Sequence, residues 1–358
     1  MHRTVWLLAF TWSLSAAAGP RVATWEEELV DATGKVGQHV SLAVDRAGDA
    51  HLTYYEFLPN GTRRLRYARK TTQGWSTQTV DGSGNVGGVS SLALDAQGRP
   101  QVTYFDYANQ SLRLARWTGA RWVVELVDGL ESVGMDSSLV LDSRGEPHVS
   151  YYDLSNGDLK YAWHDRGRWL TETVDSAGDV GAETTLALDA AGLPHIGYLD
   201  RGGRLLKYAH FNGGKWLFET VDTSGNAAGP SLALDARGQP HLSYLDRRRD
   251  KVRYAHREGG TWSTQTLLSV RAGLRTSLAF DADGDAHVSL QEPGGALVYL
   301  RHRAGGAWET TGLEGLREAA WGAALALDAS GAPLICYSDL AEHALRCARS
   351  AHEVARAP

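Results

Sequence analysis

A tryptophan recurs along this chain at a nearly constant interval, and this repeat limits the folds that the chain can adopt. Successive members of the series are 50, 47, 47, 47, 46 and 46 residues apart. The series is Trp25, Trp75, Trp122, Trp169, Trp216, Trp262 and Trp308. An aspartate series keeps the same phase, and a glycine follows each aspartate three residues later, as in Asp142 and Gly145. The repeating units fill residues 24–350, so we expect one domain there and no second one.

Each unit predicts four short strands. In the third unit, the strands 138–142, 148–153, 159–162 and 169–175 are separated by turns containing Gly, Pro, Asn and Asp. Four such strands at a period of roughly 40–50 residues are typical of β-propeller blades. The repeat begins with a Trp-type strand at 25–30 and ends with three strands that lack one. We therefore predict an all-β, seven-bladed β-propeller with four antiparallel strands per blade, in which the N-terminal strand closes the last blade.

The first residues have the layout of a secretory signal peptide. A basic start that includes Arg3 precedes a short apolar run over 5–14, and small alanines follow. The run is too short for a stable membrane anchor. We predict a signal peptide over residues 1–18, a C-terminal tail over 351–358, and a secreted or periplasmic protein. An N-terminal anchor is the alternative to the signal peptide.

Composition excludes several classes of partner. The formal net charge is −6, and no basic stripe is present, so we expect no nucleic-acid binding. No later segment reaches 18 consecutive apolar residues, so we expect no membrane span. We expect the protein to be a monomer and to bind a glycan or a protein.

The chain contains two cysteines, Cys336 and Cys347, which are too few for a four-cysteine zinc module. Alignment of the last unit on the third places Cys336 at the position of Ser150 and Cys347 at the position of Tyr161. These positions face each other across two antiparallel strands, where Cα atoms lie about 4.5–5.5 Å apart. The spacing suits a disulfide, and secretion leads to an oxidising compartment. We predict a cross-strand disulfide between the two cysteines, and two buried free thiols are the alternative.

Histidines recur at the start of the second strand of most units. They are His51, His148, His195, His241 and His287. Ligands of one metal ion must converge within about 2 Å of a common centre, whereas equivalent positions on different blades are spread around a ring. We therefore predict no metal site from this series.

An acidic series ends the second strand of each unit, on the face where first strands begin and fourth strands end. The members singled out as candidate ligand-binding residues are Asp106, Asp153, Asp200 and Asp246. Glycine-rich loops such as 81–87 lie on the same face. These oxygens could bind Ca²⁺ or a polyhydroxylated ligand, although no cofactor is required. The alternative is that each aspartate caps a turn.

Four further candidates break the repeat just before the first strand, next to the central channel. They are His39, Asp136, Glu183 and Arg275, at positions that are otherwise equivalent. Loops on a rigid scaffold commonly carry binding sites. We predict a ligand site at this channel mouth, and ordinary loop variation is the alternative. Asp136 and Glu183 lie on adjacent blades, so they could also pair as acid and base in glycoside cleavage.

The repeat resembles those of secreted bacterial β-propellers of the sialidase (Asp-box) superfamily type, best seen at residues 231–244 and 252–255. The resemblance spans residues 24–350 and implies the propeller architecture. Sialidase Asp boxes have Asp-x-Gly followed by an aromatic residue, whereas these turns have Asp-x-x-Gly. No arginine triad of the sialidase type is assignable either, so the resemblance does not extend to sialidase activity.

Three functions follow as hypotheses. The first is a secreted, lectin-like, non-catalytic propeller that recognises a glycan or protein on its upper face. The second is a glycoside hydrolase or polysaccharide lyase that uses the carboxylate pair at the channel mouth. The third is a structural or interaction module of the cell envelope or matrix. We favour a protein that is not an enzyme and assign no catalytic residue.

Overall fold

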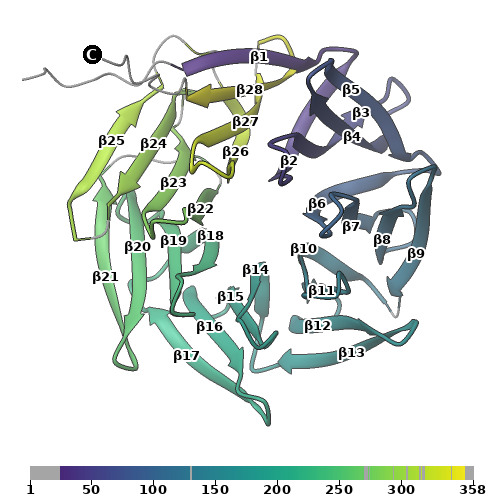
Figure 1. The fold of residues 1–358 in the computed structure, drawn as a ribbon. Coiled ribbons are helices and arrows are strands. Elements are labelled where there is room, and N and C mark those ends of the chain that lie inside the picture. Colours follow the sequence, from purple (N-terminus) through teal and green to yellow (C-terminus); the bar gives the residue numbers. More distant parts are fainter. Residues whose placement is uncertain are drawn as a thin grey trace, which may run out of the picture.

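The computed structural model describes residues 25–129, 131–269, 273, 275–292, 294–303, 305–313, 316, 319–339 and 341–350. The predicted signal peptide and C-terminal tail lie outside these residues. The described segments form 28 β-strands in seven four-stranded sheets, arranged as blades around a central axis (Figure 1). None of them forms a helix that is long and apolar enough to cross a membrane. The predicted all-β, seven-bladed propeller is confirmed.

Blade 1 contains β2 (Lys35–Val44), β3 (Ala50–Phe57), β4 (Arg63–Thr71) and β5 (Gly74–Asp81). Blade 2 contains β6 (Val86–Leu94), β7 (Pro100–Asp106), β8 (Ser111–Trp117) and β9 (Trp122–Asp128). Blade 3 contains β10 (Val133–Leu141), β11 (Pro147–Asp153), β12 (Asp158–Asp165) and β13 (Arg168–Asp175). Blade 4 contains β14 (Val180–Leu188), β15 (Pro194–Asp200), β16 (Leu205–Phe211) and β17 (Trp216–Asp222). Blade 5 contains β18 (Ala227–Leu234), β19 (Pro240–Asp246), β20 (Lys251–Glu258) and β21 (Thr261–Leu268). Blade 6 contains β22 (Thr276–Phe280), β23 (Ala286–Gln291), β24 (Leu297–His302) and β25 (Trp308–Gly312). Blade 7 contains β26 (Ala319–Leu327), β27 (Pro333–Asp339), β28 (Leu345–Ser350) and the N-terminal strand β1 (Trp25–Asp31).

Strand β1 closes the ring by pairing with the last strand of the chain. It runs antiparallel to β28, from the pair Trp25 and Ser350 to the pair Asp31 and Leu345 (Figure 1). This pairing covers the edge that β28 would otherwise expose, and open edges promote aggregation. The predicted closure of the last blade by the N-terminal strand is confirmed.

The second strand of each blade is buried along almost its whole length. In β7 every residue is buried, and Val102 and Tyr104 expose no surface. A strand with one solvated face would alternate between buried and exposed residues, so both faces of β7 are covered by neighbouring blades. The core is accordingly a series of layers between blades; in one layer Tyr161 of blade 3 packs with Leu186 and Ile196 of blade 4.

Hydrogen bonds repeat at the junctions between blades. Ser138 Oγ accepts a hydrogen bond from Leu186 N of the next blade at 3.0 Å. Equivalent bonds occur at five other junctions, and in each a first-strand serine or threonine accepts from a leucine amide of the next blade. Blade 7 has Ala324 at this position, which has no hydroxyl, so its junction with blade 1 lacks this side-chain acceptor.

A second repeated junction joins a tyrosine, an aspartate and a basic residue. Tyr198 OH donates to Asp175 Oδ2 of the preceding blade at 2.7 Å, and Lys207 Nζ donates to the same oxygen at 2.5 Å. Burial raises the pKa of Asp175, but the hydrogen bonds from Lys207 and Tyr198 outweigh it and hold this pKa below its usual value. The carboxylate is therefore a charged acceptor that ties two blades together.

The two cysteines form the predicted disulfide. Cys336 in β27 lies opposite Cys347 in β28, in the register that pairs Ser150 with Tyr161 in blade 3. Their Cα atoms are 4.0 Å apart, slightly closer than the range expected for opposed strand residues. Both cysteines are buried, so the bond lies inside the blade that closes the ring.

Candidate functional site

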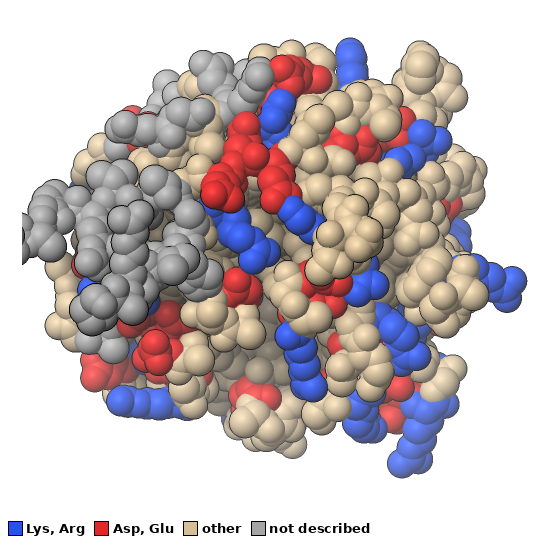
Figure 2. Space-filling view, turned by 45° about the horizontal axis from the view of Figure 1, so that its top comes forward, with Lys and Arg blue, Asp and Glu red and all other residues tan. Residues whose placement is uncertain are grey.

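The strand order gives the ring two distinct faces. The upper face carries the connections between blades, such as 82–85, and the turns between second and third strands, such as 107–110. The lower face carries the turns between first and second strands, such as 95–99, and those between third and fourth strands, such as 118–121. Acidic and basic side chains are interspersed over the part of the surface seen in Figure 2.

Three of the four predicted mouth residues lie at irregularities of the first strands. The pairing register shifts at His39, Asp136 and Glu183. All three have left-handed backbone conformations, with φ of 49°, 52° and 48°. Such conformations are uncommon for residues other than glycine, and β-bulges often redirect a side chain beside a functional site. The non-repeating residues therefore occupy backbone positions that are themselves unusual.

Arg275 links opposite sides of the ring. It precedes β22 in blade 6, and its Nη2 lies 3.3 Å from Asp136 Oδ1 of blade 3. Two blades separate these residues along the ring, so the arginine side chain spans the upper channel mouth. The Arg275 side chain keeps 39% of its surface exposed, whereas Asp136 keeps 11%.

The carboxylates of Asp136 and Glu183 connect successive blades. Asp136 Oδ2 accepts a hydrogen bond from Glu183 N at 3.0 Å, and Glu183 Oε2 accepts one from Gly229 N at 2.5 Å. A series of contacts thus runs from Arg275 through Asp136 and Glu183 to blade 5. Sequence reasoning placed these residues at one mouth, and the structure brings them into contact.

His39 belongs to the same electrostatic cluster. Its ring stacks on Tyr55 with centroids 5.6 Å apart. Burial lowers the pKa of His39 to about 4, helped by the positive charges of Arg275 and Arg63 and opposed by Asp136. The imidazole is therefore neutral at neutral pH and can donate or accept a hydrogen bond.

The acidic series at the end of the second strands is engaged within its own turns. Asp153 Oδ1 accepts hydrogen bonds from the amides of Ser155 and Asn156, at 3.0 and 3.1 Å. Asp106 does the same in blade 2, Asp200 accepts from Gly203 N at 2.6 Å, and Asp246 contacts Arg249 at 3.0 Å. This is the turn-capping alternative; a ligand role for the four aspartates stays a prediction. Among the residues described, no three His, Cys, Asp or Glu side chains converge as a metal site requires.

The histidines of the series pair with tyrosines inside five of the seven blades. His195 Nδ1 and Tyr208 OH are 2.5 Å apart in a hydrogen bond, and His51 Nε2 also lies 3.3 Å from Asp45 Oδ2. These contacts give the histidines a structural role within their blades.

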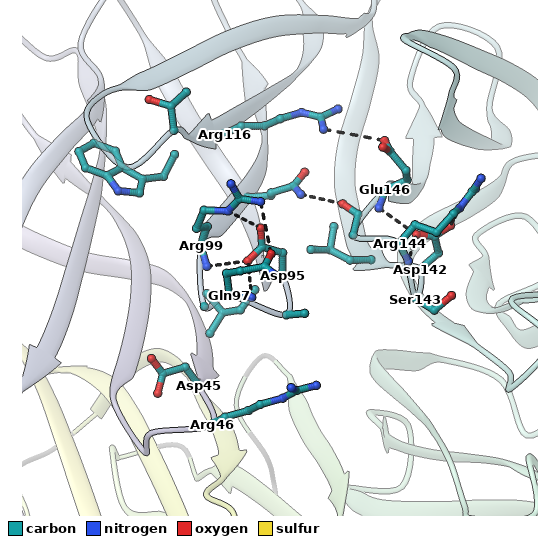
Figure 3. A pocket seen from close by; sticks show the side chains of 18 of the residues that line it. Asp45, Arg46, Asp95, Gln97, Arg99, Arg116, Asp142, Ser143, Arg144 and Glu146 are labelled. Carbon is teal, nitrogen blue, oxygen red and sulfur yellow. Dashed lines mark hydrogen bonds and ion pairs between the residues drawn. The ribbon is translucent and has the colours of Figure 1, made fainter.

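A large hollow on the lower face was not predicted. It has a volume of about 920 Å³ and is lined by the first turns of blades 1, 2 and 3, together with residues 116–118 (Figure 3). Arg99 pairs with Asp95 at 2.7 Å and Arg144 with Asp142 at 2.9 Å on its rim. Sequence reasoning treated these Asp-x-x-Gly turns as equivalent. One sequence signal could have indicated the hollow. The turns of blades 1 to 3 contain or adjoin arginines, whereas the turn of blade 4 has Ala190, Ala191 and Leu193.

Comparisons with known proteins relate the chain to solved propellers. No protein-family model matches it, and no curated protein matches its sequence, so the resemblance to sialidase-type propellers gains no support. The structure is similar to AofleA from Arthrobotrys oligospora, with a TM-score of 0.54, 15% identity, and coverage of 81% of this chain and 90% of that one. It is also similar to SapL1 lectin solved with alpha methyl fucoside, with a TM-score of 0.55, 14% identity, and coverage of 79% and 99%. A fucose-recognising lectin of Aleuria aurantia, a six-bladed propeller, gives a TM-score of 0.51, 16% identity, and coverage of 76% and 94%. These similarities show the propeller fold.

Proposed function

We propose that this protein is a secreted, non-catalytic propeller that binds carbohydrate. The observation that supports this most is the similarity of its ring to lectin propellers over about four-fifths of the chain, two of which are described with fucose or a fucoside. Propellers hold ligands on loops carried by a rigid ring, and both ends of this ring present clustered polar side chains.

The channel mouth supports binding better than catalysis. Glycoside hydrolysis by a carboxyl pair needs one carboxyl that is free to give a proton to the leaving group. Asp136 instead contacts the Arg275 guanidinium and accepts from Glu183 N, and Glu183 accepts from Gly229 N. Both carboxylates thus act as acceptors that hold the mouth together, and the exposed part of Arg275 is left to meet a ligand.

A glycan array on the full-length chain, with and without Ca²⁺, tests this proposal. We expect a restricted set of glycans to bind, with no hydrolysis products by mass spectrometry. Binding to no glycan would favour the structural or interaction module, and turnover would favour the enzyme.

A paired substitution tests the upper mouth separately. Asp136→Ala combined with Glu183→Ala removes the acceptors that position Arg275, so affinity for an array-positive glycan at this site should fall at least tenfold. Arg247→Ala, on an exposed turn of the same face, is the matched control and should have no effect. Unchanged affinity in the double variant would exclude the mouth as the site.

A further inference from the structure

The lower-face hollow lies where blade 2 departs from a side-chain pair found in five other blades. The pairs are His51 with Tyr67, His148 with Tyr161, His195 with Tyr208, His241 with Tyr254 and His287 with Tyr299. Blade 2 has Gln101 in place of the histidine and Leu114 in place of the tyrosine. Gln101 lines the hollow.

Gln101 brings a buried acceptor without a partner to the hollow. The residue is 6% exposed, and its Nε2 donates to Gly145 O of blade 3 at 2.9 Å. A carbonyl oxygen only accepts, so this bond fixes which end of the amide is the nitrogen. Oε1 is then left without a hydrogen-bond partner. A buried acceptor without a hydrogen-bond partner is destabilising, so its presence needs an explanation.

Arg116 supplies a complementary donor at the neighbouring position. It lies directly opposite Gln101 in the ladder between β7 and β8. Its Nε donates to Glu125 Oε1 at 2.8 Å, while its Nη2 is buried and has no partner. The hollow therefore contains an unused acceptor and an unused donor on adjacent strands.

The charges around the hollow balance. Four arginines line it, namely Arg46, Arg99, Arg116 and Arg144, together with four carboxylates, namely Asp45, Asp95, Asp142 and Glu146 (Figure 3). Asp95 Oδ1 already accepts from the amides of Gln97 and Arg99, so the rim carboxylates are largely occupied. Equal charge favours a neutral ligand over an ion. An unused donor beside an unused acceptor suits a sugar, whose hydroxyls both donate and accept hydrogen bonds.

We propose that this hollow binds a neutral saccharide. In the bound state Gln101 Oε1 accepts from one hydroxyl, and Arg116 Nη2 donates to another oxygen of the saccharide. The volume falls within the roughly 300–1,000 Å³ that ligand pockets occupy. The ligand class rests on the proposed carbohydrate-binding function, whereas the place and the residues rest on the hollow alone.

Two substitutions that copy other blades test the site with little risk to folding. Gln101→Leu copies Leu334 of blade 7, and Gln101→His with Leu114→Tyr copies the pair of the other five blades. Arg237→Ala is the matched control, because Arg237 occupies in blade 5 the turn position of Arg144 and does not line the hollow. Thermal midpoints of all variants show whether the ring is intact.

Titration calorimetry with methyl α-L-fucoside, methyl β-D-galactoside, methyl α-D-mannoside and sodium D-glucuronate gives the readout. We expect at least one neutral glycoside to bind more tightly than glucuronate, both Gln101 variants to weaken it at least tenfold, and Arg237→Ala to leave it unchanged. If a glycoside binds and both folded Gln101 variants retain its affinity, the hollow is not the site, although the proposed function stands. If glucuronate binds more tightly than every neutral glycoside, and the Gln101 variants abolish this, the ligand class is wrong. If none of these four saccharides binds although the glycan array is positive, this inference fails and the proposed function stands; if the array is also negative, both fail.

Discussion

The disulfide in blade 7 should make a measurable contribution to the stability of the whole ring. Cys347 belongs to β28, the strand on which β1 closes the propeller, and the two strands pair at Glu28 and Cys347. The junction between blades 7 and 1 has Ala324 where six other junctions use a hydroxyl. We therefore expect the stability of this part of the ring to depend on the bond between Cys336 and Cys347.

The size of the effect follows from the loop that the bond closes. The cysteines are 11 residues apart. The chain-entropy relation gives about 9 cal/mol/K for such a loop, which is about 2.8 kcal/mol at 25 °C. The variant Cys336→Ser with Cys347→Tyr loses this contribution while restoring the opposed Ser–Tyr pair of blade 3, formed there by Ser150 and Tyr161.

Urea unfolding of the oxidised and the reduced protein, followed by tryptophan fluorescence, measures this contribution. We expect reduction to lower the free energy of unfolding by about 2–3 kcal/mol. The same reductant should leave the Cys336→Ser, Cys347→Tyr variant unchanged, which separates loss of the bond from an effect of the reagent. Identical unfolding curves for the oxidised and the fully reduced native chain would refute the reasoning. Two alkylatable thiols under denaturing, non-reducing conditions would refute the bond itself.

Three further predictions concern the junctions between blades and the closure of the ring. Tyr198→Phe removes only the hydroxyl that donates to Asp175, so the free energy of unfolding in urea should fall by about 1.5–3 kcal/mol. An unchanged free energy of unfolding would mean that this hydrogen bond does not contribute to stability. The folded-state pKa of Asp175 lies below its usual value, so its contribution to stability is complete above about pH 4 and is lost as pH falls through the folded pKa. Thermal midpoints that stay level from pH 7 to pH 3 would contradict this. Deletion of residues 24–31 exposes the edge of β28 and should cause aggregation by light scattering, whereas an unchanged midpoint and solubility would argue against the closure.

The fold was predictable because its causes are local and repeated. Alternating strand residues, turn residues and the tryptophan period each recur in every blade, so a misreading in one unit is corrected by the others. The closure by β1 followed from the phase of the repeat, and the disulfide followed from aligning Cys336 and Cys347 on a hairpin of equal length. These inferences required only the register within a single blade.

The candidate sites depend on contacts between blades, which a repeat does not specify. The sequence marked Asp136 and Arg275 as irregular, but their contact arises because two distant blades face each other across the channel. The hollow was missed for the same reason, since three turns that read as equivalent form one concavity when they lie side by side. The sequence also left two roles open for Asp153, a ligand and a turn cap, and its hydrogen bonds show that it caps its own turn.

The structure compensates several departures from the repeat, whereas it leaves the one at Gln101 uncompensated. At the junction of blades 5 and 6, the aspartate, tyrosine and basic residue become Leu268, Leu290 and Val298, which join one apolar cluster.

In blade 7, the cysteine at the tyrosine position is bonded to Cys336, and an apolar leucine replaces the histidine. Each of these exchanges replaces a hydrogen-bonded group of polar side chains with apolar contacts or with a disulfide. Gln101 in blade 2 differs, because it keeps a buried oxygen that no protein atom satisfies, beside an unsatisfied nitrogen of Arg116. A purely structural exchange had an apolar solution available in the same chain, so the retained polar pair is best explained by a ligand that completes its hydrogen bonds.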